Sequence, residues 1–308
     1  MVTQVDCRGE KIGAVGPTVE IVLKELVRRI CARDQALEGI PGHVVVADDF
    51  AAALVELGDP PPPPGAVVPT VARTLFREAG PVLVLEGAQV AAALGGEAED
   101  MARFVHLLHS EMWRIRLHLD ALAAGEDALG AWQDSVFDSQ LRPVVEAMRH
   151  EYGVTRRAVW SLPTDADLML KHFMDVLDAL PPATQEDVTL ALSGNDLDGL
   201  FVRSLGRIAH LVQTAAHAQG YLAGLGKPLA AISPQMDAAL REGFFGVHWG
   251  PLTEQLDAVF HAGGAAEIEM QRQRLQETVV DVFASLGLQV RRAEDGGVWI
   301  EAGVASRG

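Results

Sequence analysis

The chain has 308 residues, of which 49% are hydrophobic, and 25 Lys and Arg against 42 Asp and Glu give it a formal net charge of -17. This hydrophobic content can supply a substantial core, which argues against an intrinsically disordered chain. The negative charge repels a phosphate backbone, so nucleic-acid binding would need a local basic patch. The arginines at 114, 116, 156 and 157 are too interspersed with acids to form one.

Cysteine usage and hydropathy predict a cytoplasmic, water-soluble protein. Cys7 and Cys31 are the only cysteines, which argues against a disulfide framework or a Cys-rich zinc site. The first ten residues contain no apolar signal core. The uncharged stretch 208–226 approaches the length of a membrane span, but its two histidines and two glutamines make it too polar. We therefore expect no membrane association.

The first elements are predicted to be a helix, a strand and a helix. Pro17 is suited to a first helical turn, and apolar residues follow at helical spacing as far as Arg33. His43 to Ala47 is a β-branched run that indicates a buried strand. Asp48 and Asp49 are then expected to cap a short helix that continues through Leu57.

Two strands and a long helix are predicted next. Pro60 to Pro64 cannot donate backbone hydrogen bonds, so we expect an extended surface strut there. Residues 67–77 and 81–85 have the spacing of a hairpin, and Pro69 would place the first strand at an edge. Residues 96–124 then show a helical stripe of apolar side chains, formed by Met101, Val105, Leu108, Met112, Ile115, Leu119 and Leu122.

The rest of the chain is predicted to be mostly helical. Breaks are expected near Pro163, Pro181-Pro182, Gly194-Asn195, residues 226–228 and residues 246–250. A final helix, 265–286, precedes a hairpin formed by 289–292 and 298–301. We therefore predict an α+β fold that is predominantly helical, with a small sheet and a C-terminal β-hairpin. The expected domains are an α+β domain, 1–160, a helical region, 161–264, and a C-terminal helix and hairpin, 265–308, packed with the preceding region.

The segment from Phe104 to Asp120 contains a degenerate metal-binding pattern. In an HExxH helix, two histidines one turn apart bind zinc and the glutamate between them acts as general base. Here this frame falls on Ser110, Glu111, Met112, Trp113 and Arg114. The glutamate is kept, but a serine is a poor zinc ligand and an arginine places a permanent positive charge where the cation would bind.

This segment and its surroundings resemble the zincin-like metallopeptidases over residues 17–160. The resemblance implies a small sheet that backs the motif helix, with Glu111 at the general-base position. It also implies that Glu151, on a later helix, occupies the position of the third zinc ligand. Ser110 and Arg114 depart from the family at both histidine positions, so we expect no bound cofactor, because a catalytic zinc uses three protein ligands.

Arg114 offers a replacement for the lost metal. At 100° per residue, Glu111, Arg114 and His118 fall within about 60° of one another at the border of the apolar stripe. A guanidinium can bridge two carboxylates through its fork of donors. We therefore hypothesise an ion cluster of Glu111, Arg114 and Glu151 in the former metal cavity. The simpler interpretation is an ordinary amphipathic helix with a Glu-Arg pair three residues apart.

Other histidines and nucleophiles give weaker signals. His106 and His109 lie about 140° and 160° from Glu111 around the helix, so neither can share an ion with it. Only His118 could, together with Glu151. Neither Ser193 nor Ser204 stands in a Gly-x-Ser-x-Gly elbow, no phosphate-binding loop occurs, and neither cysteine lies in a catalytic signature.

The sequence favours a catalytically degenerate zincin-like protein that acts by binding a protein or peptide. One alternative is an active, zinc-dependent metallopeptidase with a shifted ligand set: His118, Glu151 and a histidine from the second half of the chain. Another is a helical scaffold or assembly protein with a coincidental motif. In that case residues 43–85 should not form a sheet beside the helix at 96–124. The oligomeric state is not indicated.

Overall fold

The computed structural model describes residue 2 and residues 4–59, 71–124, 135–163 and 167–302. The chain forms two compact units, which are described separately. The first contains Met1–Leu122 and a returning segment, Trp160–Thr164. The second contains Ala123–Val159 and Asp165–Gly308. Together they confirm an α+β fold that is predominantly helical, with a small sheet and a C-terminal β-hairpin.

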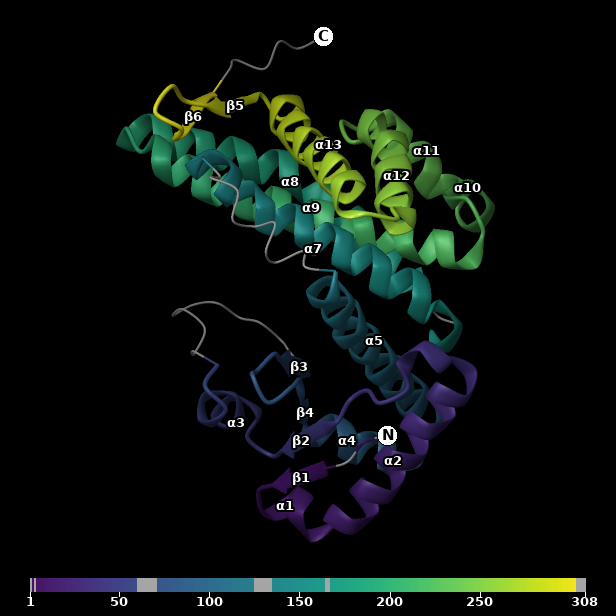
Figure 1. Ribbon diagram of the computed structural model, residues 1–308. Coiled ribbons are helices and arrows are strands. Elements are labelled where there is room, and N and C mark those ends of the chain that lie inside the picture. Colours follow the sequence, from purple (N-terminus) through teal and green to yellow (C-terminus); the bar gives the residue numbers. More distant parts are fainter. Residues whose placement is uncertain (1, 3, 60–70, 125–134, 164–166, 303–308) are drawn as a thin grey trace. The chain divides into compact units, whose positions relative to one another are not determined.

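The first unit is built on a four-stranded sheet in the order β1-β2-β4-β3 (Figure 1). Strands β1 (Gln4–Arg8), β2 (His43–Ala47) and β4 (Val82–Glu86) are parallel, and β3 (Ala72–Leu75) is antiparallel to β4. The predicted strand at 43–47 and the predicted hairpin are therefore confirmed within the described residues. The proline run and Pro69 lie outside them.

Strand β1 was not predicted from the sequence. Its residues, Gln-Val-Asp-Cys-Arg, lack the β-branched run that marked β2. After it the chain turns at Gly9, whose φ of 110° is unfavourable for other residues. The Asp48 carboxylate accepts hydrogen bonds from the backbone amides of Lys11, at 2.8 Å, and Ile12, at 3.2 Å. Asp48 thus ties the turn after β1 to the end of β2, whereas we expected it to cap the next helix.

Local sequence accounts for most helices of the first unit. Pro17 stands in the first turn of α2, and the Asp49 carboxylate caps α3 by accepting a hydrogen bond from the Ala52 amide at 2.9 Å. The helical elements are α1 (Glu10–Ala14), α2 (Gly16–Arg33), η1 (Gln35–Leu37), α3 (Phe50–Glu56), α4 (Gly87–Leu94), α5 (Ala98–Ala123) and the short turn η2 (Val159–Ser161), which ends in the returning segment.

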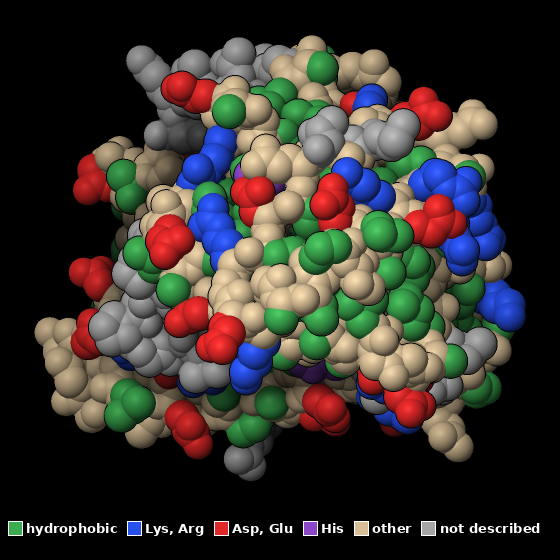
Figure 2. Space-filling view, turned by 90° about the horizontal axis from the view of Figure 1, so that it is seen from below, with side chains coloured by type: hydrophobic (Ala, Val, Ile, Leu, Met, Phe, Trp, Pro, Cys, Tyr) green, Lys and Arg blue, Asp and Glu red, His purple; other side chains and the backbone are tan. Residues whose placement is uncertain are grey.

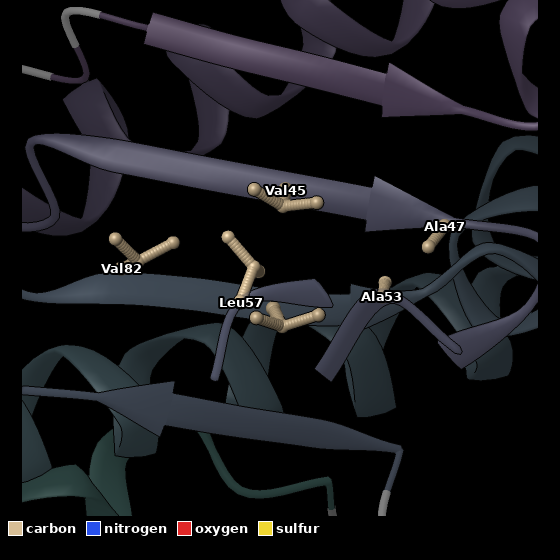
Figure 3. Packing of buried hydrophobic residues seen from close by; sticks show 6 residues of the cluster. Val45, Ala47, Ala53, Leu57 and Val82 are labelled. Carbon is tan, nitrogen blue, oxygen red and sulfur yellow. The ribbon is translucent and has the colours of Figure 1, made fainter. Parts of the chain in front are cut away.

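Strands β2 and β4 form the centre of this sheet, and their side chains are almost entirely buried. Figure 3 shows Ala53 and Leu57, from α3 and its end, beside Val45 and Ala47 of β2 and Val82 of β4. Complete burial of one of the larger aliphatic side chains, a valine or a leucine, stabilises the folded state by about 1.5–3 kcal/mol. The β-branched pattern at 43–47 therefore marks a strand covered on both faces, as is usual in parallel sheets.

The second unit is mainly helical. Its described elements are α7 (Val136–Ala158), α8 (Asp167–Gly194), α9 (Leu197–Leu225), α10 (Leu229–Ile232), α11 (Pro234–Glu242), α12 (Gly246–His261), α13 (Ala265–Ser285), β5 (Leu288–Arg292) and β6 (Val298–Ala302). Strands β5 and β6 form the antiparallel hairpin predicted at the C-terminal end.

Helices α7 and α9 approach closely through glycine. A Cβ atom at Gly220 would lie 2.7 Å from the carbonyl oxygen of Tyr152, and one at Gly224 would lie 2.7 Å from that of Arg156. Because larger residues would separate the two backbones, these glycines permit the close packing.

The compact units divide the chain between Leu122 and Ala123, whereas the expected domain boundary was at residue 160. Helix α7, which carries Glu151, packs with the later helices.

One predicted helix break is wrong, and another is displaced by a few residues. Helix α8 continues through Pro181 and Pro182, both of which are exposed, while its buried side chains pack against α9. Tertiary packing there offsets the backbone hydrogen bonds that proline removes. The break predicted at residues 246–250 lies slightly earlier, between the end of α11 at Glu242 and the beginning of α12 at Gly246. A Cβ at Gly246 would lie 2.6 Å from the Leu240 carbonyl oxygen, so this glycine serves a close approach.

Charged side chains of both signs are mixed on the face drawn in Figure 2, where acidic groups stand among the basic ones. On this face the acidic side chains are therefore not collected in one block. Within the ranges that the structure describes, no helix combines the length and apolar character needed to cross a bilayer.

Candidate functional site on two faces of helix α5

Helix α5 buries two polar side chains, His109 and Glu111. They are two residues apart, so they project about 160° away from each other around the helix axis. The apolar side chains Phe104, Leu108, Met112 and Ile115 are also buried on this helix. Because a buried polar group must be hydrogen-bonded to be tolerated, the partners of these two residues define two candidate sites.

The first site surrounds Glu111, whose side chain is 8% exposed. The Thr74 hydroxyl on β3 donates a hydrogen bond to Glu111 Oε2 at 2.9 Å. The Arg114 guanidinium donates from Nε to Glu111 Oε1 at 3.1 Å and completes an ion pair. Both carboxylate oxygens therefore accept hydrogen bonds from side chains of the same unit.

The second half of this face also contacts β3. The ring of His118 lies 3.6 Å, centroid to centroid, from the ring of Phe76, which directly follows the strand. Glu111 and His118 thus lie against the same edge of the sheet. This agrees with the prediction that they project from the same side of the helix. Ser110, beside Glu111, is partly buried. If the motif were coincidental in a helical scaffold, residues 43–85 should not form a sheet beside this helix. That expectation is contradicted, because the sheet forms and contacts the helix.

Glu151 lies on α7 and is partly buried. It belongs to the second unit, whereas Glu111 and Arg114 belong to the first. The Glu111-Arg114 ion pair is observed. The three-residue cluster that also includes Glu151 stays a prediction. Among the described residues, no three His, Cys, Asp or Glu side chains form a group that could hold a metal ion. The ligand set of His118 and Glu151 likewise stays a prediction.

The second site lies around His109, which is completely buried. Its Nδ1 atom is 2.8 Å from the hydroxyl oxygen of Ser161, in the returning segment. Its Nε2 atom is 3.5 Å from Oδ2 of Asp34, at the end of α2. The indole of Trp113 donates a hydrogen bond to the same Asp34 oxygen at 2.9 Å. A serine, a histidine and an aspartate are therefore linked in series.

Aromatic and basic groups enclose this second site. The Trp160 ring lies 4.4 Å from the His109 ring, and the Arg33 guanidinium lies over the Trp160 ring at 4.2 Å. His106 Nδ1 is 2.9 Å from the Ser161 hydroxyl oxygen. No pattern in the sequence predicted this site. Asp34, His109 and Ser161 are separated by 75 and 52 residues and share no local motif.

The second unit contains a cleft of about 860 Å³ between α7, α13 and β5. Its apolar lining residues are Phe137, Val145, Val280 and Val290, and its charged ones are Asp138, Arg142, Glu146, Glu269, Arg272, Glu277, Asp281, Arg291 and Arg292. This volume falls in the range of small-molecule and side-chain binding pockets.

Three of the cleft arginines are held by neighbours. Arg272 Nε is 2.5 Å from Glu146 Oε1, Arg292 pairs with Asp138, and the Arg291 guanidinium lies 4.1 Å from the centre of the Trp299 ring. Burial raises the pKa of Glu146, but the positive charges of Arg149 and Arg272 lower it by more, so the pKa lies below its ordinary value. Both carboxylates of these pairs therefore stay ionised near neutral pH.

Two acidic side chains of the cleft remain for a ligand. Among the described residues, neither Glu277 nor Asp281, both exposed on α13, takes part in an ion pair. They stand four residues apart on the helix, so their carboxylates project from the same face. The cleft lining contains five acidic side chains and four arginines, so its formal charge is slightly negative.

Comparisons with protein-family models, curated proteins and solved structures found no match to this chain.

Proposed function

We propose that the protein is a catalytically degenerate zincin-like protein that acts by binding a protein or peptide. The loss of catalytic activity is inferred from the hydrogen bonds and the ion pair of the Glu111 carboxylate. A general base must have a lone pair directed at the water or substrate proton it removes. Here Thr74 and Arg114 each donate one hydrogen bond to Glu111, and the fixed positive charge of Arg114 is paired with the carboxylate at a position where the family has a zinc ligand.

Metal content and peptide hydrolysis test this part. We expect the purified chain to contain far less than one zinc per molecule and to cleave fluorogenic peptides no faster than its Glu111→Gln variant. The alternative, an active metallopeptidase, predicts stoichiometric zinc and cleavage that Glu111→Gln abolishes. Elemental analysis and peptide assays on the same preparation separate the two, and the second result would reject the proposal.

The cleft of the second unit supports the binding role. Its apolar floor can bury a hydrophobic side chain, while Glu277 and Asp281 can pair with a cation. The net charge of -17 also steers cationic partners toward the protein. The partner that fits these features is a peptide segment in which an apolar side chain is flanked by Lys or Arg.

Fluorescence polarisation with labelled peptides tests this partner. A peptide with an aromatic or aliphatic residue between arginines should bind more tightly than its counterpart with glutamates. Changing both Glu277 and Asp281 to Lys should weaken binding about tenfold or more, because two attractive charges become repulsive. Glu254→Lys, on exposed α12 surface outside the cleft lining, makes the same kind of charge change and should have a smaller effect.

Equal binding of the basic and acidic peptides would refute the proposed partner. So would equal losses from the cleft variant and from Glu254→Lys, because the effect would then come from net charge alone. Measurements at two salt concentrations check this, since a long-range charge effect is screened more strongly than a local ion pair.

A further inference from the structure

The site around His109 contains the three residue types of a nucleophilic serine site. We propose that Ser161 is an activated nucleophile, with His109 as its general base and Asp34 as the residue that orients His109, and that it transfers acyl groups from small carboxylic esters to water. This activity is separate from the degenerate metal site, because it uses the opposite face of α5.

The proposal assigns neutral His109 the tautomer that carries its proton on Nε2. Asp34 can only accept a hydrogen bond at the oxygen that faces Nε2, so Nε2 must carry the proton. Nδ1 then has a free lone pair and accepts the hydrogen bond from the Ser161 hydroxyl. The ring is therefore prepared to remove the serine proton.

Asp34 is itself fixed by a second donor. The Trp113 indole binds the same carboxylate oxygen, and both Trp113 and His109 project from α5. The 3.5 Å separation between Asp34 and Nε2 is long, which is common in free catalytic sites and shortens when the base takes up positive charge. Asp34 would stabilise the imidazolium that forms in the reaction.

His106 has a positioning role at Ser161. The serine has one proton, and His109 accepts it, so the contact from His106 Nδ1 must be a donated N–H bond to the serine oxygen. This bond holds the oxygen in place. Ser161 as a residue is partly exposed.

The reaction is a balanced acyl transfer without oxidation or reduction. The Ser161 O–H bond breaks, its proton moves to His109 Nδ1, and Ser161 Oγ forms a bond to the ester carbonyl carbon. The carbon–oxygen bond to the leaving alcohol then breaks, and the alcohol takes the proton from His109. Water then gives a proton to His109 Nδ1 and its oxygen bonds to the acyl carbon; the bond from that carbon to Ser161 Oγ breaks, Oγ takes the proton from His109, and the carboxylic acid leaves. The Trp160 ring beside His109 favours an apolar ester.

A fluorophosphonate probe tests the nucleophile directly in the full-length chain. The Ser161 oxygen should bond to phosphorus while the phosphorus–fluorine bond breaks, with the proton passing to His109 and fluoride leaving. We expect mass spectrometry to locate the label on Ser161, and Ser161→Ala to abolish labelling and the hydrolysis of an apolar nitrophenyl ester. Ser139→Ala is the matched control. Its exposed hydroxyl bonds only to the Val136 carbonyl in the described structure and should be dispensable.

Asp34→Asn tests the proposed relay with little change in shape. An asparagine keeps an oxygen for the donors Trp113 and His109 Nε2, but it removes the negative charge that would stabilise the imidazolium formed in the reaction. We expect labelling to slow about 100-fold or more, and His106→Asn to slow it less, about tenfold. Circular dichroism establishes that each variant is folded.

The pH profile of the unmodified chain provides a measurement that does not depend on a variant. Labelling should accelerate as pH rises, because only neutral His109 can accept the proton, and it should level off once the ring is deprotonated. Absence of a label on Ser161, a rate independent of pH, or labelling unchanged in folded Asp34→Asn would overturn the proposal. These results would leave the cluster with only the structural role of holding the returning segment.

Discussion

Glu111 and His109 stand two residues apart on α5 and are both buried, but their hydrogen-bond partners give them different chemical capacities. Glu111 accepts donors at both oxygens, from Thr74 and Arg114. His109 connects a carboxylate on one side with a hydroxyl on the other. The first arrangement holds the carboxylate in an ion pair with Arg114, whereas the second places the His109 ring next to a hydroxyl group whose proton it can take up. A familiar motif position is therefore a poorer guide to chemistry than the full set of partners.

Removing His109 should have the largest effect on stability. His109→Ala leaves a cavity in a fully buried position and deprives Ser161 and Asp34 of a partner, so we expect the free energy of unfolding of the first unit to fall by about 3 kcal/mol. Hydrogen exchange of the β2 and α5 amides measures that unit specifically. His261→Ala changes an exposed histidine and should cost less than about 0.5 kcal/mol. Equal losses would show that the His109 face contributes no special packing.

Breaking the ion pair on the other face should have the next largest effect. Arg114→Met keeps an aliphatic stem but leaves Glu111 buried without its cation, which we expect to cost about 2 kcal/mol. Adding Glu111→Gln removes the uncompensated charge and should restore about half of that loss. A double-mutant cycle followed by urea unfolding checks this coupling. Additive losses would mean that Arg114 does not compensate Glu111.

Removing the hydroxyl of Thr74 should have a smaller effect. Thr74→Val keeps the shape of the side chain and its preference for a strand, but takes one donor from Glu111, at a cost of about 1 kcal/mol. Thr74→Ser retains the hydroxyl and should lose only a few tenths of a kcal/mol. If thermal unfolding ranks the two variants in the reverse order, the hydrogen bond to Glu111 is not what Thr74 contributes.

Removing metal should have the smallest effect. If Arg114 has replaced zinc at the Glu111 face, dialysis against a chelator should change the free energy of unfolding by less than about 0.3 kcal/mol, since no bound metal stabilises the folded state. Calorimetry before and after dialysis measures this. A large loss that zinc restores would mean that a metal is part of the folded protein, contrary to our proposal.

Local patterns predicted most elements because they depend on near neighbours. The β-branched run at 43–47 predicted a buried strand, and Pro17 and Asp49 predicted the beginnings of helices. Local reasoning failed at Pro181 and Pro182, where packing against α9 maintains the helix. It also failed at β1, whose residues show no strand pattern and which pairs with β2 across nearly 40 residues of chain.

The candidate sites show the same division. Helical spacing alone placed Glu111 beside Arg114 and directed His109 to the opposite side of α5, because the angle between residues of one helix is fixed. Only the tertiary structure could supply Thr74, Asp34 and Ser161, since each comes from a separate segment of the chain. The sequence thus determined which side chains share a face, and folding decided which distant groups complete each site.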